Sequence, residues 1–273
     1  MSNPNLSLRR RTAINLGLLI SYLFALPVYA IAKGPKCSQV AVDAALDASV
    51  PVSARFVQQL KRTHIHTIIR YYDWKDETIR GKTLRPAEIK AIADAHLSVA
   101  VVFQHHNDRT ATFTDPDRGS VDAARAHELA VQFHQPTSSV IYFGVDGVDA
   151  LFADQMPHEK SPERKYGLVF IRHYFEKVGA TLSQYNSSYR IGAYGSGLVC
   201  SDLLSHNLIS ICWLANATSW PGYEEFDRSK EWALKQQLPT RAADCFGIEG
   251  DVDVIGRADF GQWFPLPMDG MSQ

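Results

Sequence analysis

The sequence predicts an α/β fold, a (β/α)8 TIM-type barrel whose last units are shorter than the rest. Short apolar runs rich in β-branched residues alternate with amphipathic helical stretches, an order typical of a parallel sheet covered on both faces. About eight such units fit within the 273 residues, a length typical of a single barrel. A doubly wound open sheet is the main alternative, but no G-x-G-x-x-G follows the first predicted strand.

The strands are predicted from apolar runs that contain Val and Ile and stop at polar residues. In chain order, these runs are residues 39–46, 66–73, 97–104, 138–146, 189–195, 209–217, 232–238 and 251–256, of which the last two are the weakest. The helical stretches between them have apolar residues three and four positions apart, and Pro86 suits the first turn of its helix. The predicted helices are residues 53–63, 85–96, 120–134, 161–182 and 197–207.

The N-terminus has the layout of a secretory signal peptide. A basic cluster, Arg9 to Arg11, precedes an apolar run over residues 14–28 and the small residues Ala30 and Ala32. The arginines also fit a twin-arginine signal. An uncleaved anchor is the alternative, which the polar residues and the proline within the apolar run weaken. We therefore predict a signal peptide over residues 1–32, export to a secreted or periplasmic location, and no stable membrane span after cleavage.

The remaining residues, 33–273, are predicted to form one barrel domain. All four cysteines of the chain lie in this part, where an oxidising compartment permits disulfides. We predict a Cys37–Cys245 disulfide, because each cysteine precedes a strand and the first and last strands of a closed barrel are neighbours. Cys212 lies in an apolar run, which leaves it as a buried free thiol or as the partner of Cys200.

Several classes of partner are not supported by the sequence. The formal net charge of −1 gives no basic face for nucleic acid. The cysteines lack C-x-x-C pairs and the histidines lack an H-x-x-x-H helix, so we expect no metal and no other cofactor. The sequence does not support serine-hydrolase chemistry either, because the residues around Ser196 do not complete a G-x-S-x-G motif.

Nearly every predicted strand ends in a polar or aromatic residue. The C-terminal ends of the strands are where a barrel of this class holds its active site. Carboxylates there can serve as acid, base or nucleophile, aromatic rings can stack on sugars, and glutamine amides can bind hydroxyl groups. The alternative is that these groups only cap strands and satisfy loop amides. The residues are Asp43, Tyr71, Asp73, Gln104, Asp146, Tyr194, Trp213, Gln236 and Asp251.

Four stretches of the sequence carry a resemblance to a known family. They are AVDAA (41–45), IYFGVD (141–146), YRIGAYGSGLVC (189–200) and DVDV (251–254). Together they resemble the secreted glycoside-hydrolase-like family catalogued as domain of unknown function 1906, over roughly residues 38–263. That family is similar to the family-25 glycoside hydrolases, the lysozyme-type muramidases that cut peptidoglycan on a barrel.

The resemblance implies a catalytic set of carboxylates. Asp43, Asp146 and Asp251 match the muramidase aspartates at strand one, strand four and the last strand. The glutamate that would donate the proton is replaced by Val148, and Asp149 is the nearest acid. We expect these four aspartates to be catalytic, and Tyr71, Asp73, Gln104, Tyr194, Trp213 and Gln236 to bind substrate.

Two functions remain open from the sequence. The first is hydrolysis of a cell-wall glycan, peptidoglycan or another polysaccharide, by a carboxylate mechanism. The second is a glycan-binding or cell-wall-remodelling accessory role without catalysis, because the proton-donor glutamate is missing. An enzyme that acts on an unrelated small substrate is a third alternative.

Overall fold

The computed structural model describes residues 43–75, 80–186, 188–241 and 245–266. The predicted signal peptide and Cys37 lie outside these residues, so the predictions for them stay predictions. Within the described part of the chain, no helix combines the length and the apolar character needed to cross a bilayer.

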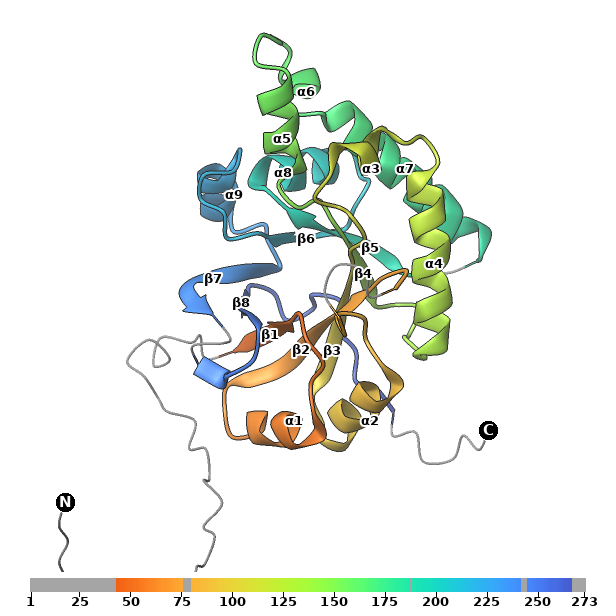
Figure 1. The fold of residues 1–273 in the computed structure, drawn as a ribbon, viewed down its shortest axis with the longest axis vertical. Helices are drawn as coiled ribbons and strands as arrows, with labels where there is room; N and C mark the ends of the chain where they lie inside the picture. Colours follow the sequence, from red (N-terminus) through yellow and green to blue (C-terminus); the bar gives the residue numbers. More distant parts are fainter. Residues whose placement is uncertain (1–42, 76–79, 187, 242–244, 267–273) are drawn as a thin grey trace, which may run out of the picture. The chain divides into compact units, whose positions relative to one another are not determined.

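Eight strands form a closed barrel in the order β1 to β8, which confirms the predicted TIM-type fold (Figure 1). The first seven strands pair in parallel, each with the next along the chain. The strands are β1 (Ala44–Ala48), β2 (Ile65–Tyr72), β3 (Ser98–Phe103), β4 (Val140–Gly144), β5 (Arg190–Gly195), β6 (Ile211–Leu214), β7 (Leu234–Arg241) and β8 (Gly250–Ile255).

The last strand departs from the all-parallel arrangement that the sequence predicts. β8 runs antiparallel to both of its neighbours, β7 and β1. Only residues 242–249 separate β7 from β8, and a parallel crossover needs a dozen or more residues. As a result, the first residues of β8 lie at the end of the barrel where the other strands finish.

Helices cover the outside of the barrel, and α4 packs along α7 on one side of it (Figure 1). The longest helices have one buried face, as the spacing of their apolar residues predicts. The helices are α1 (Ala54–Leu60), α2 (Pro86–Asp94), α3 (Thr110–Thr114), α4 (Arg118–Gln132), α5 (Val148–Gln155), α6 (Pro162–Lys165), α7 (Leu168–Gln184), α8 (Gly197–Ser205) and α9 (Tyr223–Ser229).

Alternate residues of each strand face the barrel interior and the helices. In β2, Ile69 and Tyr71 belong to the interior cluster, whereas Ile68 and Tyr72 pack into the layer beneath the helices. The same alternation in β1 turns Ala45 inward, and Asp47, two residues later, therefore points inward as well.

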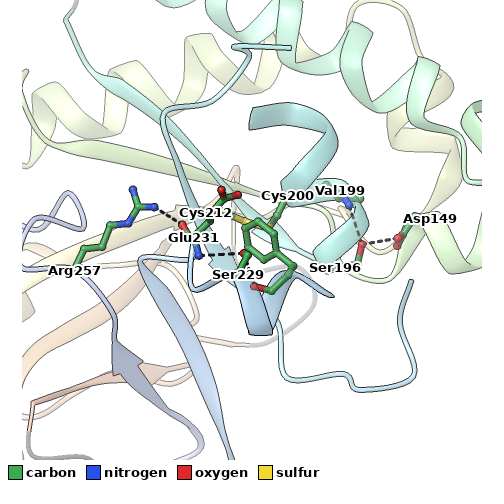
Figure 2. Close-up of a disulfide and its surroundings, with 9 residues drawn as sticks. Asp149, Ser196, Val199, Cys200, Cys212, Ser229, Glu231 and Arg257 are labelled. Atoms are coloured by element: carbon green, nitrogen blue, oxygen red, sulfur yellow. Dashed lines mark hydrogen bonds between the residues drawn. A yellow bond between two sulfur atoms is a disulfide. The ribbon is translucent and has the colours of Figure 1, made fainter. Parts of the chain in front are cut away.

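A cysteine pair ties α8 to β6. Cys200 and Cys212 form a disulfide with their Cα atoms 5.8 Å apart, which settles the two alternatives for Cys212 in favour of a Cys200 partner (Figure 2). Cys245 is buried, and its predicted partner Cys37 lies outside the described residues.

A buried ion pair holds the end of β2 against α2. The Arg70 side chain is fully buried, and its Nε donates to Glu88 Oε1 at 2.8 Å. Other nitrogens of the guanidinium donate to the carbonyl oxygens of Ala48 and Gly81. Glu88 Oε1 also accepts from the Val52 backbone N–H at 2.9 Å. This cluster therefore fixes the end of β1 and the loop between β2 and α2.

We expect Glu88→Gln to lower the free energy of unfolding by about 3 kcal/mol, because it leaves the Arg70 guanidinium buried without a countercharge. Urea unfolding at neutral pH measures the effect. The matched control is Glu128→Gln, which removes a carboxylate that is 64% exposed and paired with Arg125, where a loss below about 1 kcal/mol is expected. Equal stability of Glu88→Gln and the wild type would contradict the role given to this ion pair.

Candidate active site

A cavity of about 210 Å³ opens at the C-terminal ends of the parallel strands. It gathers seven of the ten residues that the sequence predicts for the site: Tyr71, Gln104, Asp146, Tyr194, Trp213, Gln236 and Asp251. Four further residues complete the lining: Asp47, Ser49, Lys82 and Val102. Asp251 reaches this end of the barrel because it stands near the start of the antiparallel strand β8.

Asp47 is the most strongly perturbed carboxyl group among those that line the cavity and carry a resolved shift. Its Oδ2 accepts a hydrogen bond from the Tyr71 hydroxyl at 2.8 Å, and its Oδ1 is buried with no partner among the described residues. Burial raises the pKa of Asp47 to about 7, opposed by the Tyr71 hydrogen bond and reinforced by the nearby Asp251. At neutral pH this group is therefore able both to hold and to release a proton.

The antiparallel strand β8 brings two more carboxyl groups to the same interior. Asp251 pairs with Asp47 in the β1–β8 register, and Asp253 pairs with Ala45. Since paired residues of antiparallel strands project to the same face, both carboxyl groups point into the barrel. Asp253 is fully buried and accepts from Trp213 Nε1 at 2.7 Å. Burial, followed by the charge of Asp47, raises the pKa of Asp253 well above its usual range.

Asp146 lies on the other side of the cavity and is linked to a buried lysine. Gln104 Nε2 donates to Asp146 Oδ2 at 3.0 Å, and Gln104 Oε1 accepts from Lys82 Nζ at 2.9 Å. Burial raises the pKa of Asp146, while the Lys82 charge and the Gln104 hydrogen bond lower it. The ammonium of Lys82 also lies 4.3 Å from the centre of the Tyr71 ring. Lys82 lowers the pKa of Asp47 as well, so the ionised form is favoured more at Asp146 because Asp47 is the more deeply buried and lies opposite Asp251.

The turn after β4 sets the position of Asp146. The Asp146 backbone N–H donates to the carbonyl of Asn107 at 2.9 Å, and Asn107 in turn donates to the carbonyl of Gly144. Gly147 has a φ of +68°, and a Cβ there would meet the Trp220 ring at 2.8 Å. Only glycine fits both the left-handed backbone and the close approach, and the chain then enters α5 directly after the carboxylate.

A polar wall completes the cavity between β5, β7 and β8. The Tyr194 hydroxyl donates to Gln236 Oε1 at 3.2 Å, and Gln236 Nε2 donates to Asp251 Oδ2 at 3.2 Å. The Tyr194 and Trp213 rings meet edge to face with their centres 4.8 Å apart. Trp213 is only 1% exposed, so it forms part of the wall and holds Asp253, and it offers no open face for a stacked sugar.

Three predicted site residues lie outside the cavity lining. Asp43 precedes β1, at the opposite end from the cavity, and its side chain is 74% exposed beside His66. Asp149 lies in the first turn of α5, buried, where its Oδ2 accepts from the Ser196 hydroxyl at 2.5 Å (Figure 2). Asp73 is buried and bonded to His105 Nδ1 at 2.6 Å. The structure therefore does not place these three side chains in the lining of the cavity that holds Asp146.

Local features of the chain explain why Asp47 and Lys82 line the cavity and why Asp43 and Asp149 do not. Asp43 and Asp47 both lie in the apolar stretch AVDAALDASV, and the strand, Ala44–Ala48, holds Asp47 near its end and leaves out Asp43. Pro51, which follows soon after Asp47, is the signal that could have placed the strand end correctly. Asp149 is turned away from the cavity because a helix begins at Val148, directly after the strand and its turn. Lys82 lies in a loop, where no periodicity predicts which side chains turn inward.

The fold and the cavity together define a class of protein. The barrel has eight strands and gathers three carboxyl groups, a lysine and two amides at the C-terminal ends of its parallel strands. This layout is typical of barrels that bind polar substrates. The chain belongs to the Rv2525c-like, glycoside hydrolase-like domain family, whose family model matches residues 58–254. The resemblance seen in the sequence to a glycoside-hydrolase-like family is thereby confirmed.

The structure is also similar to individual solved structures. The structure resembles the Tat-secreted protein Rv2525c of Mycobacterium tuberculosis in its complex with L-tartrate, with a TM-score of 0.61 and 20% identity, over 82% of this chain and 100% of that one. It also resembles an uncharacterized B. stearothermophilus protein, with a TM-score of 0.56 and 14% identity, over 82% of this chain and 99% of that one. At these identities the likeness supports the fold alone.

A curated relative is matched in sequence. The chain is 25% identical over 201 residues to the uncharacterized protein YbfG of Bacillus subtilis (strain 168), a match that covers 70% of this chain. The chain spans only 26% of the length of YbfG.

The raised pKa of Asp47 predicts a specific dependence of stability on pH. The unfolded chain releases this proton with the ordinary pKa of 3.8, and the folded chain holds it up to a pKa of about 7. The stability contributed by Asp47 is therefore fully present at acidic pH and is lost as the pH rises between these values. Asp47→Asn removes this titration and still accepts from Tyr71, so we expect it to gain stability relative to the wild type by about 1 kcal/mol per pH unit over that window.

Urea unfolding of both proteins at several pH values between about 4 and 8 measures this difference. Asp43→Asn is the matched control, because Asp43 is exposed and its removal is expected to leave the pH dependence of the wild type unchanged. A stability difference between Asp47→Asn and the wild type that stays constant with pH would show that Asp47 titrates like an exposed carboxyl group.

Proposed function

We propose that this protein hydrolyses a cell-wall glycan of the peptidoglycan type by a mechanism that uses two carboxyl groups. The observation that carries the proposal is Asp47, a buried carboxyl group with a pKa of about 7, in one cavity with Asp146 and Asp251. Glycoside hydrolysis needs one carboxyl group that is protonated and another that is ionised at the working pH. Asp47 is buried opposite Asp251, whereas Asp146 is only half-buried, and this difference supports the division.

Asp47 is the proposed proton donor. A general acid works best when its pKa lies near the working pH, because it is then protonated in the ground state and still gives up its proton readily. The Tyr71 hydroxyl fixes the orientation of its carboxyl group. Under this proposal Asp47 transfers its proton to the oxygen of the leaving sugar as the glycosidic bond breaks.

Asp146 is the proposed second carboxylate. Burial raises the pKa of Asp146, and the charge of Lys82 and the hydrogen bond from Gln104 oppose this by stabilising the ionised form. It either attacks the anomeric carbon or takes a proton from the attacking water, and the anomeric configuration of the product distinguishes the two routes. Asp251, Gln104, Gln236, Tyr71 and Tyr194 provide the remaining polar contacts for hydroxyl groups.

Export is part of the same proposal. The N-terminal residues have the layout of a signal peptide with an arginine cluster, and the related protein Rv2525c is Tat-secreted. A secreted or periplasmic location would give the protein access to the cell wall.

A binding role without catalysis is the second candidate. Val148 occupies the place of the muramidase proton donor, is 0% exposed and cannot transfer a proton. If Asp47 does not replace that donor, the cavity would still bind glycan, and the protein would act as an accessory factor in cell-wall remodelling.

The test is to incubate the protein, without residues 1–32, with purified peptidoglycan and to measure the release of reducing ends. We expect Asp47→Asn and Asp146→Asn each to lower the rate at least about 100-fold, the scale of a lost general acid or nucleophile. We also expect the wild-type rate to fall as the pH rises through about 7, because Asp47 must carry its proton. Asp43→Asn, which changes an exposed aspartate outside the cavity, should retain the wild-type rate.

The outcomes separate the two candidates. Binding of wild-type protein to peptidoglycan without release of reducing ends would favour the accessory role. Cleavage that survives Asp47→Asn would remove Asp47 from the role of proton donor, and cleavage that survives Asp146→Asn would do the same for Asp146.

A further inference from the structure

We propose that the buried ion pair of Arg70 with Glu88, which lies behind the cavity wall, positions two charged groups inside the cavity. These groups are Asp47 and Lys82, whose separation the ion pair fixes. The inference rests on the proposed function for the catalytic role of Asp47 and goes beyond it by naming two residues outside the cavity lining. Arg70 lies on β2 next to Tyr71, which faces the barrel interior. Because successive side chains of a strand point to opposite faces, the Arg70 side chain lies on the outer face, beneath the helices.

The Arg70 guanidinium bonds the two chain segments that carry these charged groups. One of its nitrogens donates to the carbonyl of Ala48, the residue directly after Asp47. Another donates at 3.1 Å to the carbonyl of Gly81, the residue directly before Lys82. The N–H groups of a guanidinium have fixed directions in one plane, so bonds to two carbonyls at once set the distance between those carbonyls.

Glu88 on α2 fixes the orientation of the guanidinium. Its Oε1 accepts from Arg70 Nε at 2.8 Å and from the Val52 backbone N–H at 2.9 Å. Its Oε2 accepts from Arg70 Nη2 at 3.3 Å and from the Arg85 backbone N–H at 3.0 Å. Both side chains of the ion pair are buried, so water does not replace a bond that is lost. Any rotation of the guanidinium therefore breaks several bonds together.

The next residue of β2 contacts the same two charged groups on the cavity side. The Tyr71 hydroxyl donates to Asp47 at 2.8 Å, and the Lys82 ammonium lies 4.3 Å from the centre of the Tyr71 ring. The loop that carries Lys82 is also tied to the strand by a parallel bridge between Thr83 and Tyr71. Tyr71 therefore contacts both side chains inside the cavity, and Arg70 holds the backbone beside both of them from the outside.

The separation of Asp47 and Lys82 affects the proton on Asp47. Burial is the main cause of the raised pKa of Asp47, and the Lys82 charge opposes it. The attraction between two charges falls as their separation grows and is strongest where little water enters. The groups that act on Asp47 are Tyr71, Lys82, Asp251 and Asp253, with Arg70 behind the wall. If Lys82 moves away, Asp47 therefore keeps its proton to a higher pH.

Arg70→Lys is the informative substitution, because it keeps the positive charge beside Glu88 and removes the planar fork that spans both carbonyls. Glu88→Asp is the second variant, which keeps the carboxylate but withdraws it by one methylene group, and it carries the test if Arg70→Lys does not fold. Lys82→Met removes the cavity charge whose position is in question. The matched control is Glu128→Gln, which changes an exposed carboxylate on α4 that is paired with Arg125.

The experiment follows the Asp47 carboxyl group by NMR in protein made with isotopically labelled aspartate, between pH values of about 4 and 10. Asp47→Asn assigns the signal. We expect Lys82→Met to raise the proton affinity of Asp47 about tenfold, the scale of losing a nearby opposite charge. Arg70→Lys and Glu88→Asp should each raise it by part of that amount, and Glu128→Gln should leave it unchanged. Arg70→Lys added to Lys82→Met should raise it no further, because Arg70 acts through the position of Lys82.

Three results would overturn the inference. They are no rise in proton affinity in Lys82→Met, no rise in Arg70→Lys or in Glu88→Asp, and a full further rise when Arg70→Lys is added to Lys82→Met.

The NMR measurement does not depend on cleavage. The expected changes in a protein that does not cut peptidoglycan would support the positioning role and reject the hydrolase. In a protein that cuts peptidoglycan, the fall in rate at high pH should move to a higher pH in Arg70→Lys, together with the titration of Asp47. Cleavage with an unchanged titration in Arg70→Lys would support the hydrolase and reject the positioning role.

Discussion

The antiparallel pairing of β8 with β1 is the constraint on which the site depends. A parallel last strand would place its first residues at the N-terminal end of the other strands, away from the cavity. The reversed strand instead puts Asp251 opposite Asp47 and turns Asp253 into the interior beneath them. Three carboxyl groups on two adjacent strands then share one poorly solvated space, and their mutual repulsion and burial keep protons on some of them.

Burying these carboxyl groups together lowers the free energy of unfolding, and the hydrogen bonds around them offset only part of that loss. Asp47 and Asp253 each receive one hydrogen bond from an aromatic side chain, yet each keeps a buried oxygen with no partner among the described residues. Carboxyl groups without full hydrogen bonding are rare in a barrel interior that is otherwise filled by alanine, valine and aromatic residues. Such groups are typical of functional sites, where stability is sacrificed for a shifted pKa.

The sequence predicts the barrel and most of the cavity for one reason. The apolar runs mark the strands, and the residues at the ends of parallel strands meet at one end of a barrel whatever the loops do. Asp146, Gln104 and Tyr194 are found in this way. Asp47 is missed because Asp43, four residues earlier in the same apolar stretch, is taken as the aspartate of the first strand, whereas the strand begins only at Ala44. Lys82 and the reversed direction of β8 are missed because both depend on loop geometry, which leaves no periodic pattern.

The structure around Val148 also explains why an acid at this point of the chain could not serve as the proton donor that the resemblance to muramidases implies. Gly147 turns the chain into α5, and Val148 packs into the hydrophobic core beneath the helices. A carboxylate at position 148 would lose its hydration there without gaining a partner. Asp149 is equally buried and is bound to Ser196. Under the proposed function, the proton donor therefore has to come from another strand, and Asp47 combines an inward position in the cavity with a pKa of about 7.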